Sequence, residues 1–149
     1  MTHSFSHLLT HIVFSTKNRE ALLTADIKDR VFAYLAAGLQ AHGCLPVAIN
    51  GTTDHVHLLA NVHRDTSVAA LLRDVKANSS KWIRGLAGKR GFGWQSGYGA
   101  FAVSESNSAV VTRYIQNQEQ HHAKVPMIDE FRSLLIAHRI PFDEAYLLK

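Results

Sequence analysis

The chain of 149 residues has a single cysteine, Cys44, and no long apolar run. One cysteine excludes an internal disulfide and a thiolate cluster, so a metal ion would need His, carboxylate or amide ligands. We expect Cys44 to fill space near a strand. No apolar run approaches the roughly 20 residues of a membrane helix, and residues 1–11 do not have the pattern of a signal peptide. The sequence therefore predicts a cytoplasmic protein without membrane contact.

Charged residues are also sparse, at 19%, whereas hydrophobic residues make up 46%. This balance is typical of a globular protein and argues against disorder along most of the chain. The length suits one core, and we expect a single domain over residues 1–149. The net charge of +4 favours a polyanionic partner, although many proteins of this charge bind none.

Hydrophobic periodicity predicts four strands and four helices. Runs of β-branched and large apolar residues are typical of strands. They cover residues 7–14, 44–50, 55–62 and 94–104. Apolar residues at three- to four-residue spacing are typical of helices. They cover residues 27–39, 67–86, 107–124 and 128–138.

Turn and end signals order these elements. Thr24 can cap the first helix and Gly43 can end it, Thr66 or Ser67 can start the second, and Pro126 ends the third. The order predicts an α+β fold, a ferredoxin-like or RRM-like split βαβ sandwich. In it, a mainly antiparallel four-stranded sheet has helices packed on one face. The tail over 141–149 should pack on the domain or on a partner chain.

The sequence His55-Val56-His57 is a candidate metal site. Side chains alternate along a strand, so both imidazoles lie on one face while Val56 points into the core. A divalent cation held there can polarise a phosphoryl oxygen. The alternative is a pair of partly buried histidines supporting a hairpin, and the pair alone favours it because the chain has ten histidines.

Tyr114 and Gln118 lie four residues apart on a predicted helix and therefore share one face. A phenol attacks phosphorus usefully only as phenolate, which a nearby cation favours. An amide oxygen from Gln118 suits magnesium or manganese and leaves room for phosphate, whereas closed zinc coordination fits less well. The alternative is a tyrosine that only anchors the helix by its ring.

Two further residues are candidates for supporting roles at this site. Asp54 can orient one imidazole, although a hairpin aspartate more often caps a turn. Among His63, His121 and His122, we prefer His121 as a further ligand, since successive helical residues diverge by about 100° and cannot both face one site.

Basic residues gather in loops and on the second predicted helix, with aromatic residues among them. This pattern suits phosphate tracking and base stacking on single strands, while solvated charges and core aromatics are an equal alternative. The basic candidates are Lys17, Arg19, Arg73, Lys76, Lys81, Arg84, Lys89 and Arg90. The aromatic residues are Trp82, Phe92, Trp94 and Tyr98.

Five motif blocks, in order along nearly the whole chain, resemble the single-tyrosine HUH transposases of small insertion sequences, the TnpA type. Relatives of that type include REP-associated tyrosine transposases. The blocks are residues 11–19 (HIVFSTKNR), 54–59 (DHVHLL), Lys76 with Ser79-Ser80, 94–101 (WQSGYGAF) and 114–122 (YIQNQEQHH). One His-Val-His is weak evidence, but five ordered blocks are strong.

The resemblance implies a single HUH transposase domain that cuts and joins single-stranded DNA for excision and insertion of an insertion sequence. His55 and His57 would bind Mg²⁺ or Mn²⁺ with Gln118. Tyr114 would attack a phosphate, leaving a free 3′-hydroxyl and a 5′-phosphotyrosine that a second 3′-hydroxyl resolves without ATP. The resemblance also implies a homodimer and recognition of hairpins at the element ends.

Three other functions remain open. One is a catalytically inactive single-stranded nucleic-acid-binding module on the same fold. Another is a host-domesticated nuclease acting on repeated palindromes. The third, a zinc hydrolase of small molecules, leaves Tyr114 and the basic helix unexplained.

Overall fold

Four strands form one sheet in the computed structural model, which describes residues 3–147 and 149. The strands are β1 (Leu9–Ser15), β2 (Leu45–Gly51), β3 (His55–Asn61) and β4 (Gly99–Ala102), in the spatial order β2-β3-β1-β4. All three pairings are antiparallel. The predicted α+β fold with an antiparallel four-stranded sheet is confirmed.

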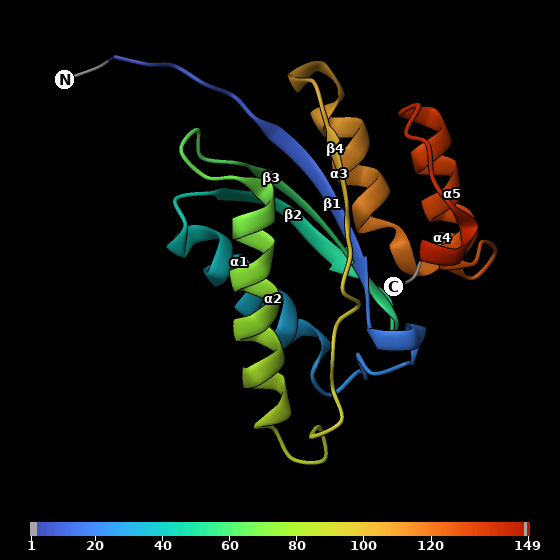
Figure 1. The fold of residues 1–149 in the computed structure, drawn as a ribbon. Helices are drawn as coiled ribbons and strands as arrows, with labels where there is room; N and C mark the ends of the chain where they lie inside the picture. The colour runs from blue at the N-terminus through green and yellow to red at the C-terminus, as the bar shows by residue number, and fades with distance from the viewer. Residues whose placement is uncertain (1–2, 148) are drawn as a thin grey trace.

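Helices cover both faces of the sheet (Figure 1). They are α1 (Lys28–Ala41), α2 (Val68–Arg84), α3 (Ser108–Gln116), α4 (Gln118–His122) and α5 (Met127–Ala137). Helices α1 and α2 lie on one face, and α3, α4 and α5 lie on the other. The prediction of helices on one face was wrong, because β1 and β3 are buried on both sides and both sides need cover.

The apolar residues divide by face accordingly. Ile12 and Val56 belong to the larger cluster, under α1 and α2, which also contains Cys44. Val13 belongs to a second cluster with Phe131 of α5 and Leu147. The tail therefore packs back on the domain through Leu147, although residue 148 lies outside the described part.

The helix ends differ in one detail from the sequence signals. Ile27, not Thr24, precedes α1, and its side chain makes no cap. The Thr24 carbonyl instead accepts the backbone N–H groups of Ile27 and Lys28. Gly43 follows α1 with a positive φ of 72°, as a helix stop requires. The hydroxyl of Ser67 caps α2 by accepting the backbone N–H of Ala70 at 3.1 Å.

The fourth strand is shorter than predicted, because residues 94–98 meet β1 in another way. Trp94 makes only an isolated bridge to Thr16. The side chain of Gln95 accepts the backbone N–H of Ser15 at 2.7 Å, and the Gln95 backbone N–H donates to the Ser15 carbonyl at 2.9 Å. A side chain thus replaces part of the ladder that a longer strand would form.

The predicted helix over 107–124 is broken at Asn117, whose φ of −97° and ψ of 20° are not helical. The amide of Asn50 on β2 donates to the carbonyls of Ile115 and Gln116, each at 3.0 Å. These bonds satisfy carbonyls at the end of α3. Because of the break, α4 is a separate helix, and its axis need not follow that of α3.

Gly51→Ala is expected to destabilise the hairpin that carries His55. A Cβ at Gly51 would collide with the backbone carbonyl of His55 and lie 3.0 Å from the Cα of Val56. Only a backbone shift relieves such overpacking, at about 1–3 kcal/mol or more. Urea denaturation would measure the loss. Gly91→Ala is the matched control, since its Cβ would meet nothing within 4 Å. An equal loss in both variants would contradict the expectation.

Candidate active site

Two strands place three histidines side by side on the face covered by α3, α4 and α5. His55 and His57 alternate with Val56 on β3, and both imidazoles are fully buried. On the neighbouring strand β1, Nε2 of His11 lies 2.8 Å from Nδ1 of His57. The alternation predicted from the sequence therefore brings His55 and His57 together. His11, which the sequence did not single out, joins them.

Two more potential ligands come from the C-terminal helices, His122 of α4 and Glu130 of α5. One ligand atom from each of His55, His57, His122 and Glu130 lies within 4.8 Å of the others. We call these four residues the His–Glu cluster. Glu130 is 3% exposed, and its Oε1 lies 2.8 Å from Nε2 of His57.

Sequence reasoning missed Glu130, although a signal was present. Met127, Phe131 and Leu135 form the buried side of α5, and Glu130 falls at the same helical spacing. A carboxylate within a buried apolar stripe is costly unless it is paired, so its position there indicates a function.

The sequence favoured His121 over His122 as a further ligand, and the structure places both beside Glu130. Nε2 of His122 lies 2.9 Å from Oε1 of Glu130, while Nε2 of His121 lies 3.2 Å from Oε2. Only His122 belongs to the His–Glu cluster. The two positions diverge around the helix, and each histidine reaches a different oxygen of the Glu130 carboxylate.

The predicted residues Tyr114, Gln118 and Asp54 lie around this cluster. The hydroxyl of Tyr114 donates to Oε2 of Glu130. The ring centroids of Tyr114 and His57 lie 5.7 Å apart in an edge-to-face arrangement. Gln118 is fully buried, with Oε1 3.3 Å from Nε2 of His55. Oδ1 of Asp54 accepts from Nδ1 of His55 at 2.6 Å.

The hydrogen-bond partners fix the charge of the histidines. Both nitrogens of His55 face acceptors, Asp54 on one side and Glu130 or Gln118 on the other. Burial opposes its charged form, but the two carboxylates outweigh burial and raise the pKa of His55 to about 9. Burial lowers the pKa of His57 to about 4 and that of His11 to about 3, so both are neutral.

The same contacts set the protonation of Glu130 and Tyr114. Burial by itself would raise the pKa of Glu130, but the imidazoles of His122, His55 and His57 hold it well below its usual range. Burial and the adjacent carboxylate raise the pKa of Tyr114 above its ordinary value. The phenol is therefore held protonated, and only a cation beside Glu130 would favour phenolate.

The donor set fits a divalent metal ion. Nε2 of His122 is a buried nitrogen without a hydrogen-bond partner in the described residues, because its approach to Glu130 has poor geometry. Ligands about 2.1 Å from one ion lie at most about 4.2 Å apart, so a small contraction would close the cluster. Three imidazoles and a carboxylate suit manganese and zinc at least as well as magnesium. The Gln118 amide made zinc a poor fit in the sequence, but three histidines and a glutamate are ligands that zinc also accepts.

A cleft of about 430 Å³ opens beside the cluster. Asp54 and His122 line it together with two cations, Arg19 and Lys28. Arg19 has an exposed side chain in the turn after β1, while Lys28 is paired with Glu119. Glu119 also lines the cleft, so the cation that it leaves for a phosphate beside the His–Glu cluster is Arg19.

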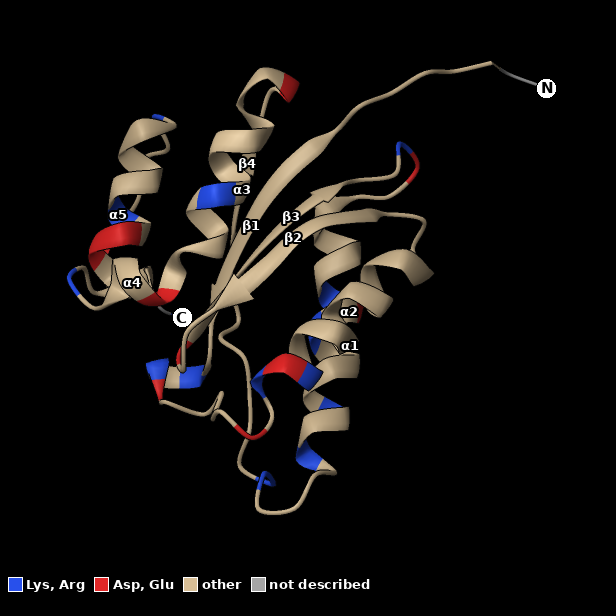
Figure 2. Ribbon diagram, turned by 180° about the vertical axis from the view of Figure 1, so that it is seen from behind, with Lys and Arg blue, Asp and Glu red and all other residues tan. Residues whose placement is uncertain are grey.

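The other basic candidates lie elsewhere, most of them on or after α2 (Figure 2). Arg73, Lys76 and Arg84 line a second cleft. Lys17, Lys81, Lys89 and Arg90 line neither cleft. Two of the aromatic candidates, Phe92 and Trp94, are buried in the core and cannot stack on bases, whereas Tyr98 is 37% exposed.

Comparisons with known proteins find a matching family model and similar solved structures. Residues 4–118 match the family model described as IS200-like transposase. A crystal structure of a candidate transposase from Deinococcus radiodurans R1 aligns with a TM-score of 0.63 and 23% identity, covering 79% of this chain and 95% of that one. A REP-associated tyrosine transposase bound to a REP hairpin aligns with a TM-score of 0.62 and 14% identity, covering 84% and 76%. Such identities support the fold alone. Among curated proteins, none matches the chain.

Within residues 3–147 and 149, no helix has both the length and the apolar character needed to cross a bilayer.

Proposed function

This chain belongs to the IS200-like transposase family, and from this premise we propose that it cuts and rejoins single-stranded DNA with Tyr114 as nucleophile and a divalent metal as cofactor. The observation that carries the proposal is the contact between the Tyr114 hydroxyl and Glu130, a member of the His–Glu cluster. Nucleophile and potential metal ligands share one buried carboxylate.

The proposed reaction is a balanced transesterification. Tyr114 gives up its phenol proton, its oxygen attacks a backbone phosphorus, the bond to the 3′-oxygen breaks, and that oxygen takes up one proton and leaves as a free 3′-hydroxyl. The 5′ end is then linked to the tyrosine. In the reverse sense, a second 3′-hydroxyl attacks the phosphotyrosine, and Tyr114 leaves with a proton. One phosphodiester is exchanged for another, so no ATP is consumed, and the cycle excises or inserts an element.

The chain's own residues prepare this step. His55, His57, His122 and Glu130 would hold the cation, with Gln118 as a further oxygen donor next to His55. The cation supplies polarisation of the phosphate and charge stabilisation for the phenolate. Asp54 orients His55, and His11 orients His57. Such outer partners fix which nitrogen faces the metal.

The partners and the cofactor follow the same proposal. The similar structure holds a REP hairpin, and we extend hairpin binding at element ends to this chain, with Arg19 beside the cluster and the basic residues of α2 as DNA contacts. We also propose a homodimer, a single HUH domain over 1–149 and Mg²⁺ or Mn²⁺ as the ion. His121 would support Glu130 from the side away from His57.

A covalent-adduct assay tests this function. Purified protein is incubated with single-stranded DNA carrying its element's end hairpin, labelled at either end, with Mg²⁺, Mn²⁺ or EDTA. A denaturing gel should show a metal-dependent protein adduct at the 5′ end of the fragment on the 3′ side of the cut and a free 3′-hydroxyl on the fragment on the 5′ side. DNA binding without an adduct or a nick at any metal would favour the inactive binding module.

Metal affinity is expected to rise with pH. The folded pKa of His55, about 9, exceeds its ordinary 6.5, so the imidazole is charged at neutral pH and must lose a proton to bind metal. Between about pH 6.5 and 8.5, affinity should rise about tenfold per pH unit for that proton. Calorimetry in buffers of different ionisation enthalpy measures proton release. Asp54→Asn removes the carboxylate that charges His55 and should flatten the slope, whereas no release in the wild type would contradict the assignment.

A further inference from the structure

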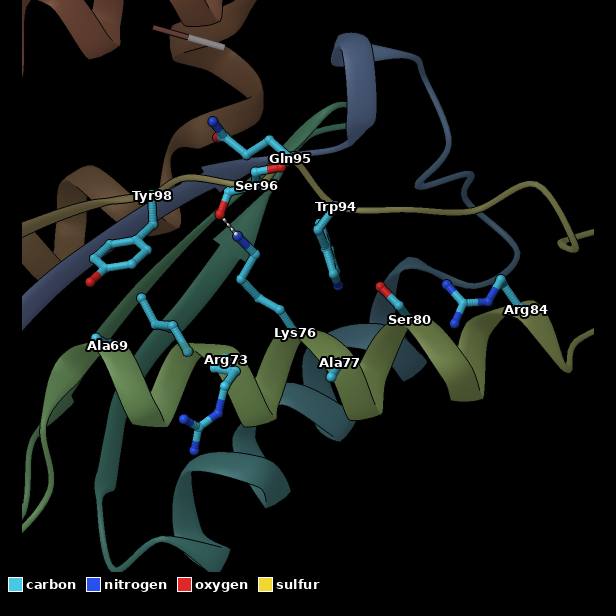
Figure 3. Close-up of a pocket in the computed structure, with 11 residues that line it drawn as sticks. Ala69, Arg73, Lys76, Ala77, Ser80, Arg84, Trp94, Gln95, Ser96 and Tyr98 are labelled. Atoms are coloured by element: carbon cyan, nitrogen blue, oxygen red, sulfur yellow. Dashed lines mark hydrogen bonds between the residues drawn. The ribbon is translucent and has the colours of Figure 1, made fainter. Parts of the chain in front are cut away.

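A second cleft, of about 490 Å³, lies between α2 and residues 94–98 (Figure 3). Its floor is on the face of the sheet covered by α1 and α2, since the ammonium of Lys76 lies 5.3 Å from the ring centroid of Phe14 in that core. It is therefore separate from the cleft beside the His–Glu cluster. Its volume falls within the roughly 300–1,000 Å³ of sites for ligands of nucleotide size.

The cleft is lined by cations and contains no carboxylate among its lining residues. Lys76 points across it and donates to the carbonyls of Ser96 and Gly97 at 3.2 and 2.8 Å, leaving a third N–H donor. Arg84 lies at one end of the cleft in Figure 3, and Arg73 lies at the rim with its guanidinium turned away from residues 94–98. Lys76 is therefore the cation whose charged group reaches across the cleft to residues 94–98.

Lys76 is held in an unfavourable state. Burial lowers the pKa of its ammonium to about 8, with no carboxylate to offset the effect. A half-buried cation without a counter-charge costs stability that a neutral residue would not. An anionic ligand would supply the missing charge.

Tyr98 gives the cleft a second kind of contact. Its side chain is 37% exposed and stands at the end of the cleft opposite Arg84. Its hydroxyl makes no hydrogen bond in the described residues, and its partly exposed side chain borders the cleft. An aromatic ring beside a phosphate-binding cation is the combination that holds an unpaired base and its backbone.

We propose that the cleft between α2 and residues 94–98 binds one unpaired nucleotide of the DNA substrate, with its phosphate at Lys76 and its base against Tyr98. The proposal rests on the proposed function for the identity of the polyanion. The DNA would then bind on the face of the sheet opposite the one that carries the His–Glu cluster. An unpaired nucleotide is favoured over duplex because the ring of Tyr98 reaches only a base whose face is free.

Binding measured in EDTA separates this site from catalysis. Fluorescence anisotropy would follow a labelled thymidine oligonucleotide and an abasic oligonucleotide of equal length. Lys76→Met keeps the apolar stem over Phe14 and should weaken binding of both about tenfold, with a salt slope smaller by about one. Tyr98→Ala should weaken thymidine binding at least about fivefold and leave abasic binding unchanged, whereas Tyr98→Phe should bind as the wild type does.

Arg64→Ala is the matched control, because Arg64 is an exposed cation in the loop between β3 and α2 and lines neither cleft. Equal losses in Arg64→Ala and Lys76→Met would indicate diffuse attraction and overturn the site. Wild-type binding by both Lys76→Met and Tyr98→Ala would also overturn it. If Lys76→Met does not fold, the Tyr98 pair decides alone. If the variants lose DNA binding as expected but the wild-type protein forms no covalent adduct, the nucleotide site in the cleft is supported and the proposed function is refuted.

Discussion

Replacement of Tyr114 by phenylalanine is expected to abolish the covalent DNA adduct while leaving DNA binding intact. The variant lacks the oxygen that would form the phosphotyrosine, and no other hydroxyl contacts Glu130 among the described residues. Loss of a nucleophile lowers catalysis by orders of magnitude, here at least about 10³-fold. Denaturing gels would measure the adduct and the nick, and anisotropy in EDTA would measure binding.

The fold should tolerate this change. The phenyl ring keeps its edge contacts with His57 and His121, and Oε2 of Glu130 still faces His121. The cost is about 1 kcal/mol for one lost hydrogen bond. Tyr146→Phe is a suitable control, since Tyr146 is 65% exposed and lies in the tail. Normal nicking by Tyr114→Phe would refute the nucleophile, and loss of binding would show that the tyrosine has a structural role.

Glu130→Gln is expected to weaken divalent metal binding by at least about 100-fold, more than the loss of an outer partner costs. The substitution keeps the shape of the side chain but removes the only anionic oxygens of the His–Glu cluster. Charge is a principal determinant of affinity for hard cations. Titration calorimetry with Mn²⁺ at fixed pH would measure the loss, with His57→Ala as the variant expected to lose the site.

Gln118→Ala makes this test decisive. The family resemblance assigns the third ligand to Gln118, whose Oε1 lies 3.3 Å from Nε2 of His55, whereas Glu130 approaches both His55 and His57. We expect the smaller loss from Gln118→Ala, because its amide is neutral whereas Glu130 supplies anionic oxygens. A larger loss from Gln118→Ala than from Glu130→Gln would restore the ligand set implied by the resemblance. Glu130 would then only occupy the position that the ion takes.

The arrangement of Glu130 connects metal binding to the nucleophile. Without an ion, the carboxylate accepts a hydrogen bond from the Tyr114 hydroxyl and keeps the phenol protonated. An ion drawn to the same carboxylate would neutralise it and remove the repulsion against phenolate. Metal binding and activation of Tyr114 would thus be coupled through one side chain.

The sequence determined the features that depend on local periodicity. Alternation along β3 placed His55 and His57 on one face, and helical spacing located α1 and α2 to within a few residues. Tyr114 and Gln118 could also be found, because the four-residue relation survives the break at Asn117. These features require only neighbours in the chain, and their geometry is set by the backbone.

Only the tertiary structure decided the rest, since it depends on contacts between distant segments. The bonds from Asn50 that end α3, and the bond from the Gln95 side chain that shortens β4, join residues at least 65 positions apart in the chain. The break at Asn117 lets α4 bring His122, and not His121, into the cluster. Packing of α5 against β1 brings Glu130 to histidines more than 70 residues earlier in the chain. Local propensity carries no information on which distant donors a buried carboxylate will meet, so the centre of the site could be seen only in the folded protein.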